Sequence, residues 1–174
     1  MKVIAFGAST SSTSINKALA TYAASLIEGA DVEVLDLTQF DVPLFSEDKE
    51  KEIGQAEGAK AFLDAIATAD ALVISYAEHN GHHPAAYKNL FDWATRIERE
   101  VFKGIPAVYL ATSPGPGGAA NVLAAATNSA PYFGGNVKAS VSVPSFYDVF
   151  DLEAGKLTDK VLIDKIESAV NQLS

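Results

Sequence analysis

Short apolar segments and segments with helical spacing alternate along the whole chain. The apolar segments, which we expect to form five strands, cover residues 2–6, 32–37, 72–76, 107–112 and 137–143. Apolar side chains recur at helical spacing over residues 15–28, before residue 69, over 85–100, before residue 130 and over 159–173. Such strict alternation predicts an α/β fold with a parallel sheet and helices on both faces. We expect a single domain spanning residues 1–174.

The order of the strands decides which loops meet. Because crossovers between parallel strands are right-handed, few topologies remain, and we favour the strand order 2-1-3-4-5. In this order the first and third strands are neighbours, and the loops that follow them lie side by side. Open α/β sheets bind ligands at such a switch point, outside the carboxyl ends of the strands. We therefore expect the functional site where the loop after residue 6 meets the loop after residue 76.

Charge and composition narrow the classes of partner. The chain has a net charge of −9, whereas binding to nucleic acid or to anionic lipid depends on basic patches. It has no cysteine, which excludes a disulfide framework, a thiolate nucleophile and a cysteine-ligated metal. The first apolar segment is too short for a signal peptide, and no apolar run approaches the ~20 residues of a membrane span. We expect a cytoplasmic protein that acts on a small molecule.

The loop after the first strand is rich in hydroxyl groups. Residues 9–14 are all serine or threonine, and Asn16 follows at the start of a predicted helix. Unpaired N–H groups at a helix N-terminus bind anions, and hydroxyls can donate to phosphate oxygens. Since the loop has neither a GxxxxGK[ST] nor a GxGxxG pattern, a monophosphate fits better than a nucleoside triphosphate or a dinucleotide. The alternative is a solvated turn in which Ser14 is an ordinary N-cap.

Two further loops follow the third and fourth strands. Residues 77–84 read AEHNGHHP, with a turn expected at Asn80-Gly81 and with Pro84 suited to the first turn of a helix. We expect this loop to hold the flat part of the ligand. Residues 113–118 read SPGPGG, and the glycines allow the backbone to approach a flat ligand closely. The alternative for this second loop is a plain strand-to-helix connection.

The three loops resemble those of the NADPH-dependent FMN reductase family, flavodoxin-like proteins that include bacterial quinone, azo and chromate reductases. The family pattern S-G-S-x-R-x-x-S-x-N is matched at Ser9, Ser14 and Asn16, whereas Ser11 stands at the arginine position and Ala8 at a glycine position. The pattern P-E-Y-N-x-x-x-P-x-x-x-K-N-x-x-D-W is matched at most positions, with departures at Ala77 and His79; the matching residues are Glu78, Asn80, Pro84, Lys88, Asn89, Asp92 and Trp93.

This resemblance implies a flavodoxin-like fold and an enzyme that contains FMN and uses NADPH or NADH. Hydride would pass from the nicotinamide to the flavin and on to a quinone, azo compound, flavin or similar acceptor. No side chain is assigned as a catalytic acid or base and none as a metal ligand, because the chemistry belongs to the cofactor. The implied cofactor-binding residues are Ser9, Ser11, Ser14, Ile15, Asn16, Ala77, Glu78, His79, Asn80, Gly81, Ser113, Pro114, Gly115, Gly117 and Gly118.

The resemblance also implies a homodimer or homotetramer. The predicted helix over residues 85–100 carries Leu90, Phe91, Trp93 and Ile97, which spread over more than one helical face. A single buried stripe would not need so many apolar side chains, so we expect the surplus to pack against a second subunit.

Other functions remain open at this point. A non-enzymatic flavodoxin-like electron carrier would suit the acidic composition. A metal-dependent hydrolase would use the cluster of Glu78, His79, His82 and His83, because imidazole and carboxylate groups suit zinc or iron. The side chains of two adjacent histidines diverge, however, and the spacing matches no HExxH-type motif. We therefore expect His82 and His83 to be exposed loop residues.

Overall fold

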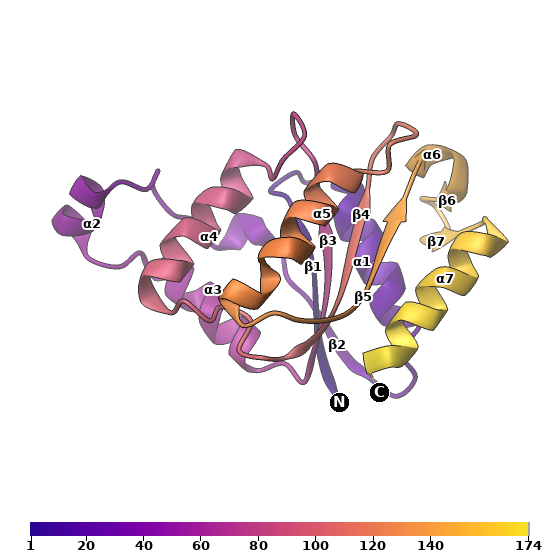
Figure 1. The fold of residues 1–174 in the computed structure, drawn as a ribbon, viewed down its shortest axis with the longest axis horizontal. Coiled ribbons are helices and arrows are strands. Elements are labelled where there is room, and N and C mark those ends of the chain that lie inside the picture. Colours follow the sequence, from indigo (N-terminus) through magenta and orange to yellow (C-terminus); the bar gives the residue numbers. More distant parts are fainter. Residues whose placement is uncertain (174) are drawn as a thin grey trace.

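A parallel sheet forms the centre of the molecule in the computed structural model, which describes residues 1–173 (Figure 1). Its strands are β1 (Lys2–Ala8), β2 (Asp31–Val34), β3 (Ala71–Tyr76), β4 (Pro106–Thr112) and β5 (Asn136–Val143). They form a 5-stranded sheet in the order β2-β1-β3-β4-β5, with every neighbouring pair parallel. The predicted fold and strand order are confirmed, and the arrangement is that of the flavodoxin-like folds.

Helices cover both faces of this sheet. The helices are α1 (Ile15–Ser25), α2 (Glu47–Ile53), α3 (Glu57–Ala67), α4 (Ala85–Ile97), α5 (Ala120–Ser129), α6 (Phe146–Val149) and α7 (Lys160–Val170). Short 3-10 helices lie at Leu37–Gln39, Ala130–Phe133 and Asn171–Leu173, and a small hairpin joins β6 (Phe150–Asp151) to β7 (Lys156–Leu157). Among residues 1–173, no helix has the length and apolar character needed to cross a bilayer.

The strands sort their side chains to two separate cores. Val3 and Ala5 of β1 pack in a cluster with α1 and α7, whereas Ile4 and Phe6 pack in a cluster with α3, α4 and α5. This alternation is the period of two that a strand imposes on its side chains. Both clusters are apolar because each face of a parallel sheet is covered by helices. The buried sheet therefore holds the loops at its carboxyl edge on a rigid base.

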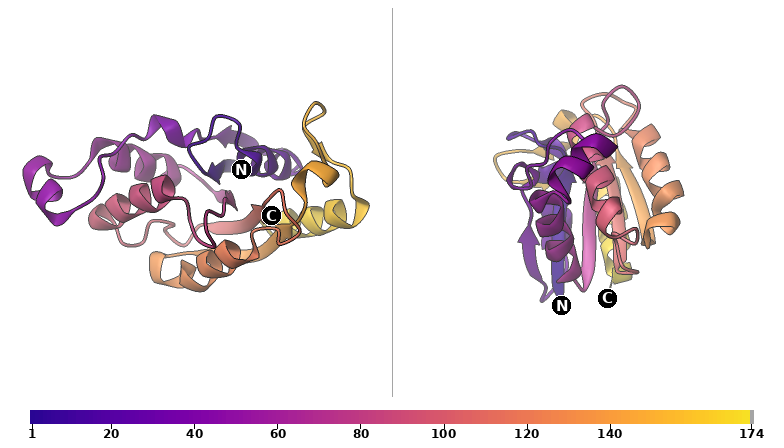
Figure 2. Two further views of the ribbon diagram at one scale, coloured as in Figure 1. Left: turned by 90° about the horizontal axis from the view of Figure 1, so that it is seen from above. Right: turned by 90° about the vertical axis from the view of Figure 1, so that its left-hand side faces the viewer.

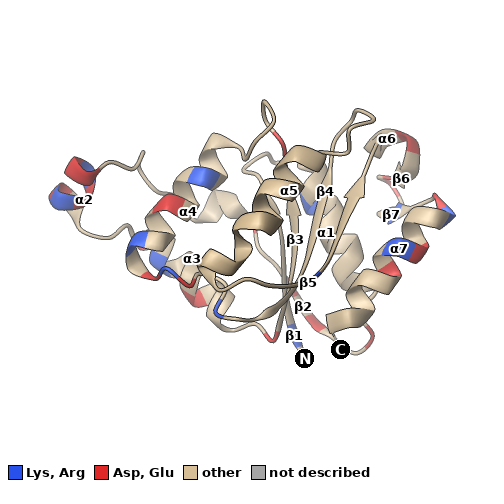
Figure 3. Ribbon diagram, viewed as in Figure 1, with Lys and Arg blue, Asp and Glu red and all other residues tan. Residues whose placement is uncertain are grey.

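Helix α2 was not predicted, because it has no buried face. Its sequence, EDKEKEI, is mostly charged, and none of its residues is buried. The helix begins where the Ser46 side chain accepts a hydrogen bond from the backbone N–H of Lys49, and it ends at Gly54. Figures 1 and 2 show α2 projecting from the body, and Figure 3 shows acidic and basic residues side by side on it. An Arg96–Glu50 ion pair of 2.9 Å connects it to α4.

The apolar residues of α4 are buried or partly buried within the chain. Leu90 and Trp93 are buried in the core, and the ring of Phe91 lies 4.9 Å from that of Phe133 and 5.8 Å from that of Phe102. Ile97 also packs against this core. Residues distant in the sequence thus provide part of the cover for α4, so its apolar content alone does not require a second subunit. The homodimer or homotetramer stays a prediction that rests on the family resemblance alone.

Candidate functional site

The predicted loops meet at a crevice of about 270 Å³ at the carboxyl edge of the sheet. The residues that line this crevice are Ser9, Ser11, Thr13, Ser14, Ile15, Asn16, Ala77, Glu78, His79, Thr112, Ser113, Pro114 and Tyr147. They come from the end of β4 and from the segments that follow β1, β3, β4 and β5, including the first turn of α1 and the short helix α6. Of the expected site residues, those that do not line it are Asn80, Gly81, Gly115, Gly117 and Gly118. The structure adds Thr13, Thr112 and Tyr147.

The hydroxyl loop offers several donors to this crevice. Ser14 is the N-cap of α1, and its Oγ accepts a hydrogen bond of 3.1 Å from the backbone N–H of Lys17. The Oγ of Ser9 likewise accepts from the backbone N–H of Ser11, at 3.1 Å. Both hydroxyls act as acceptors in these bonds, so each keeps its proton for donation. The first backbone N–H groups of α1, at Ile15 and Asn16, have no partner within the helix and complete the set of donors.

A close approach of backbone to backbone places α1 at the end of β1. A Cβ atom built on Gly7 would lie 2.8 Å from the carbonyl carbon of Asn16 and equally close to Cα of Lys17. Real Cβ atoms do not come so near to backbone atoms, so any side chain here would push the first turn of α1 away from the sheet. Glycine at this position therefore sets where the N-terminus of the helix lies.

Three buried polar residues form one network beneath the crevice. Apart from tyrosine and tryptophan, Asn16, Ser75 and Thr112 are the only residues with polar side chains that are buried among residues 1–173. The Asn16 Oδ1 accepts from the Ser75 hydroxyl at 2.7 Å and from the Thr112 N–H at 3.1 Å, and its Nδ2 donates to the Thr112 carbonyl at 3.1 Å. The Thr112 hydroxyl donates to the Val143 carbonyl at 2.7 Å. The network thus ties α1 to the ends of β3, β4 and β5.

This network changes the role that we assign to Asn16. Its oxygen and one of its amide hydrogens are already used by protein groups, which leaves a single N–H for any ligand. Asn16 lines the crevice, but its main contribution is to hold the strand ends together. The sequence motif marks the residue correctly and does not reveal these partners.

No lysine or arginine lines the crevice. The nearest cation along the helix, Lys17, donates to the carboxylate of Asp36 at 2.8 Å. This hydrogen bond holds the pKa of Asp36 well below its usual range, so the pair stays ionised at neutral pH. The positive charge of Lys17 is therefore matched by Asp36, and an anion at the crevice depends on hydroxyls, backbone N–H groups and the dipole of α1.

The loop after β3 is a tight hairpin. The backbone N–H of His79 donates to the His82 carbonyl at 2.8 Å, and the His82 N–H donates back to His79 at 3.1 Å. The two residues between them, Asn80 and Gly81, have φ values of 53° and 81°. Positive φ at both positions is the requirement of a type I′ turn, which Asn-Gly satisfies best. The predicted turn is confirmed. Asn80 and Gly81, at its tip, do not line the crevice.

Glu78 fixes this hairpin to α5. Its Oε2 accepts a hydrogen bond of 2.9 Å from the backbone N–H of Val122, in the first turn of the helix. The N-cap residue of α5, Ala119, has no side chain that can cap the helix. The Glu78 carboxylate therefore replaces a local cap and interacts favourably with the helix dipole. The loop after β3 is positioned by a helix more than forty residues away in the chain.

We expect Glu78→Gln to lower the free energy of unfolding by about 0.5–1 kcal/mol, because the amide can still accept the hydrogen bond but loses the charge–dipole interaction. Urea unfolding measures this difference. Glu153→Gln removes an equal charge in an exposed turn and is the matched control. Equal effects of the two substitutions would contradict the capping role.

The loop after β4 is fastened to the segment after β5. The backbone N–H groups of Ser145 and Phe146 donate to the carbonyls of Gly115 and Ser113, at 2.9 and 3.0 Å. This brings Tyr147, which is 60% exposed, to the mouth of the crevice. Tyr147 was missed because residues 144–158 have no regular pattern. Its position directly after the fifth strand could have indicated it, because that position lies at the ligand-binding edge of the sheet.

The asparagine and tryptophan of the second motif lie outside the crevice. The Trp93 Nε1 and the Asn89 Nδ2 both donate to the carbonyl of Pro43, at 2.7 and 2.9 Å. The Asn89 Oδ1 accepts from the N–H of Phe45 at 2.8 Å, and the Phe45 and Trp93 rings meet edge to face at 5.1 Å. These residues hold the segment that leads to α2. Trp93 belongs to the core.

One of the two adjacent histidines is not the exposed residue that we expected. His82 is exposed, but His83 is partly buried, with its ring 5.4 Å from those of Tyr76 and Tyr87. The expectation failed for His83 because the tight turn directs this side chain back towards α4. Within residues 1–173, no group of three or more histidine, cysteine, aspartate or glutamate side chains is placed to hold a metal ion.

Comparison with known proteins identifies a family and several relatives of this chain. The family model described as NADPH-dependent FMN reductase matches residues 1–148. An NAD(P)H-dependent FMN reductase of Pseudomonas aeruginosa is 29% identical over 163 residues, which cover 92% of this chain and 86% of that protein. A quinone reductase of Escherichia coli is 32% identical over 90 residues, or 51% of this chain and 48% of that protein.

Solved structures show the same fold. FerB of Paracoccus denitrificans, described as a flavoenzyme NAD(P)H:(acceptor) oxidoreductase, has a TM-score of 0.75 and 25% sequence identity. The match covers 99% of this chain and 94% of that chain. The similarity therefore extends over the whole sheet and all the loops at its carboxyl edge.

Proposed function

Because the chain belongs to the NADPH-dependent FMN reductase family, we propose that its crevice holds FMN and serves the transfer of hydride from NAD(P)H to a small quinone-type acceptor. The phosphate lies at the hydroxyl loop, and the ring lies between the hairpin after β3 and the loop after β4. The observation that carries this proposal is the meeting of these loops in one crevice at the switch point of the sheet.

The hydroxyl loop fits a phosphate in number and kind of donors. Ser9 and Ser14 keep free hydroxyl protons, and α1 presents its first N–H groups beside them. These donors are uncharged, so they suit a small dianion only with the help of the helix dipole. These donors and the helix dipole together can bind a monophosphate without a further cation. A triphosphate carries more negative charge and would meet no lysine or arginine in the crevice.

The opposite end of the crevice fits a flat ring. Ala77 and Pro114 offer small apolar surfaces, and His79 stands at its edge. The His79 N–H is used inside the hairpin, whereas the backbone N–H groups of Glu78 and Asn80 have no backbone acceptor among residues 1–173. These two N–H groups are the donors that can stabilise negative charge developing on a ring.

FMN, once bound, supplies the group that accepts and then gives up hydride. The chain contributes position and electrostatics, which explains why no side chain in the crevice forms an acid–base pair. The buried network of Asn16, Ser75 and Thr112 keeps the loops at a fixed separation. Since one crevice serves both substrates, NAD(P)H must leave before the acceptor enters.

The kinetic test is steady-state oxidation of NADPH by the purified protein with 1,4-benzoquinone. Successive use of one crevice predicts parallel lines in double-reciprocal plots, the pattern of a ping-pong mechanism. NADH is assayed in parallel, because the crevice reveals no preference between the two nucleotides. A non-enzymatic electron carrier would turn over neither nucleotide alone, so absence of any turnover would support that alternative. Intersecting lines would instead show that both substrates bind together.

We expect Ser11→Arg to raise the affinity for FMN by about tenfold or more. The substitution restores the cation of the family pattern at a position that lines the crevice, and a charge-assisted hydrogen bond contributes roughly 1.5–3 kcal/mol. Ser12→Arg adds the same charge at the neighbouring exposed residue, which does not line the crevice, and is the control. Calorimetric titration with FMN measures both. Equal gains in FMN affinity for the two variants would indicate a general charge effect, and the phosphate would then not lie beside Ser11.

Exchanging His79 for tyrosine, the residue of the family pattern, should leave the reaction intact. The side chain stands at the edge of the proposed ring site and takes no proton in the transfer, so we expect changes in rate and in the range of acceptors. Turnover of a series of quinones by His79→Tyr measures this. Complete loss of turnover in a folded variant that still binds FMN would assign a chemical role to the imidazole.

The assembly state is a separate proposal. We infer a homodimer or homotetramer from the family resemblance, and light scattering of the purified protein tests it. A monomer mass at micromolar concentration would contradict the inference and leave the proposed reaction untouched.

A further inference from the structure

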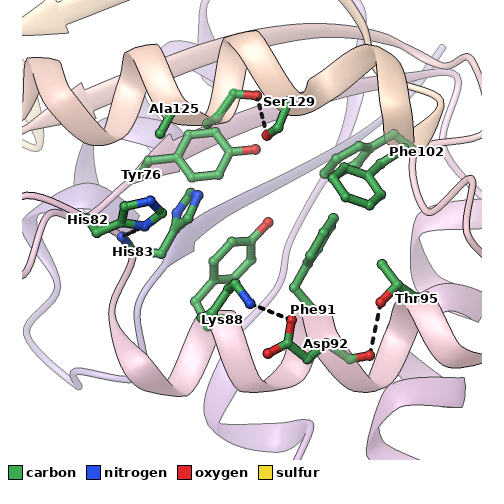
Figure 4. Close-up of a pocket in the computed structure, with 13 residues that line it drawn as sticks. Tyr76, His82, His83, Lys88, Phe91, Asp92, Thr95, Phe102, Ala125 and Ser129 are labelled. Atoms are coloured by element: carbon green, nitrogen blue, oxygen red, sulfur yellow. Dashed lines mark hydrogen bonds and ion pairs between the residues drawn. The ribbon is translucent and has the colours of Figure 1, made fainter.

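A second cavity, of about 260 Å³, lies between α4 and α5 (Figure 4). It shares no lining residue with the crevice. Its mouth is flanked by the Lys88–Asp92 ion pair of α4, whose side chains are 51% and 38% exposed. The proposed reaction makes no use of this cavity.

The walls of the cavity are aromatic. The side chains of Tyr76, Tyr87, Phe91, Phe102 and Phe133 line it, and Ala125 of α5 leaves room between them. The Phe91 ring is stacked 5.8 Å from the Phe102 ring and meets the Phe133 ring edge to face. Offset and edge-to-face contacts of this kind are the ones that a further aromatic ring can join.

A buried polar atom inside the cavity lacks a hydrogen-bond partner. The Nδ1 atom of His83 is buried and has no hydrogen-bond partner among the described residues. One layer behind lies Tyr109, with its ring 5.1 Å from that of Tyr76. Buried polar atoms without partners are rare in native proteins and call for a ligand, a water or an ion.

The cavity is also neutral. Burial raises the pKa of Tyr76 and of Tyr87 above the usual value for a phenol. Burial lowers the pKa of His83 to about 4, with smaller contributions from His82 and Lys88. At neutral pH the phenols are therefore protonated and the imidazole is uncharged. A charged ligand would lose its hydration without gaining a counterion, because Lys88 and Asp92 already neutralise each other at the mouth.

We propose that this cavity binds a neutral aromatic molecule of one or two rings that carries carbonyl or hydroxyl oxygens, of the quinone or hydroquinone class. Phenol hydroxyls donate to a carbonyl oxygen, and the free His83 nitrogen accepts from a hydroxyl. An engineered cavity of about 150 Å³ in another protein takes one benzene ring, and drug-sized ligands occupy about 300–1,000 Å³. The volume of this cavity lies above the first figure and below the range of the second, which suits a molecule of one or two rings.

This site is distinct from the one where hydride is transferred. The hairpin after β3 separates the two, since His79 lines the crevice and His82 and His83 line the cavity. A molecule in the cavity therefore binds whether or not the crevice holds FMN. The proposal does not rest on the proposed reaction.

The test measures binding of 2,3-dimethyl-1,4-naphthoquinone to the full chain saturated with FMN, in the absence of NAD(P)H, by equilibrium dialysis. This probe has no free quinone-ring position for addition to a protein amine. Ala125→Phe fills the cavity, and Ala124→Phe places the same ring on the exposed side of the same helix. We expect Ala125→Phe to weaken binding at one site by about tenfold or more, whereas Ala124→Phe binds like the wild type. FMN affinity should be unchanged in both.

A second measurement needs no variant. Nuclear Overhauser contacts between the methyl groups of the probe and the ring protons of Tyr76 and Phe133 are expected in the wild-type protein. Binding that Ala125→Phe leaves unweakened, or contacts to crevice residues alone, would overturn the proposal. Failure of FMN itself to bind would instead contradict the proposed function, so the two failures are distinguishable.

Discussion

Asn16→Ala should reduce the free energy of unfolding by about 3–5 kcal/mol. The substitution removes three hydrogen bonds from a buried network and leaves the Ser75 hydroxyl and both backbone groups of Thr112 without their partner. Each buried polar group left unsatisfied costs roughly 1–3 kcal/mol, and partial relaxation keeps the total below the simple sum. Urea unfolding of the protein without FMN measures this loss directly.

The same substitution should weaken FMN binding by about tenfold or more, because the strand ends that carry the loops lose their common anchor. Asn121→Ala, on the exposed side of α5, makes the same chemical change outside the network and is the control. The two measurements separate two roles of Asn16. A fall in FMN affinity with unchanged stability would show that the amide acts mainly as a direct phosphate donor.

Gly7→Ala should destabilise the protein by about 3 kcal/mol or more and disrupt the proposed phosphate site. The added Cβ would overlap with backbone atoms of Asn16 and Lys17, and backbone in the first turn of a packed helix cannot move as a flexible side chain does. Overpacking in a core costs about 1–3 kcal/mol, occasionally more, and a clash with backbone belongs at the upper end. Thermal unfolding and calorimetric titration with FMN test both effects.

Gly29→Ala is the informative comparison for Gly7→Ala. Gly29 has a φ of 69° and open space around its Cβ position, so alanine there brings only backbone strain. That strain costs roughly 1 kcal/mol. If Gly7→Ala proves no more harmful than Gly29→Ala, the close approach of α1 to β1 does not determine where the helix N-terminus lies.

The architecture could be predicted because strands and helices have different periods. The buried strands β1, β3 and β4 appear in the sequence as mainly apolar runs, and parallel pairing follows from their alternation with helices. Helix α2 has no buried face and so produces no periodic apolar signal. Ser46 before an acidic first turn and Gly54 after the last turn mark it instead. Local capping signals would have found this helix where hydrophobicity did not.

The location of the site could be predicted, and its internal contacts could not. A parallel sheet brings its carboxyl ends to one edge, so the sequence identifies the loops that meet there. Which atoms meet depends on contacts between distant residues, such as Asn16 with Thr112 and Glu78 with Val122, each more than forty residues apart. The same holds for His83, whose burial depends on α4 and on the tight turn before it.

The proposed function requires that FMN is held at the crevice and exchanges hydride with NAD(P)H. The most direct measurement mixes the FMN-loaded protein with NADPH, and separately with NADH, under anaerobic conditions while visible absorbance is recorded. We expect at least one nucleotide to bleach the flavin absorbance, and subsequent addition of 1,4-benzoquinone to restore it. Unchanged flavin absorbance with both nucleotides would contradict the proposed function.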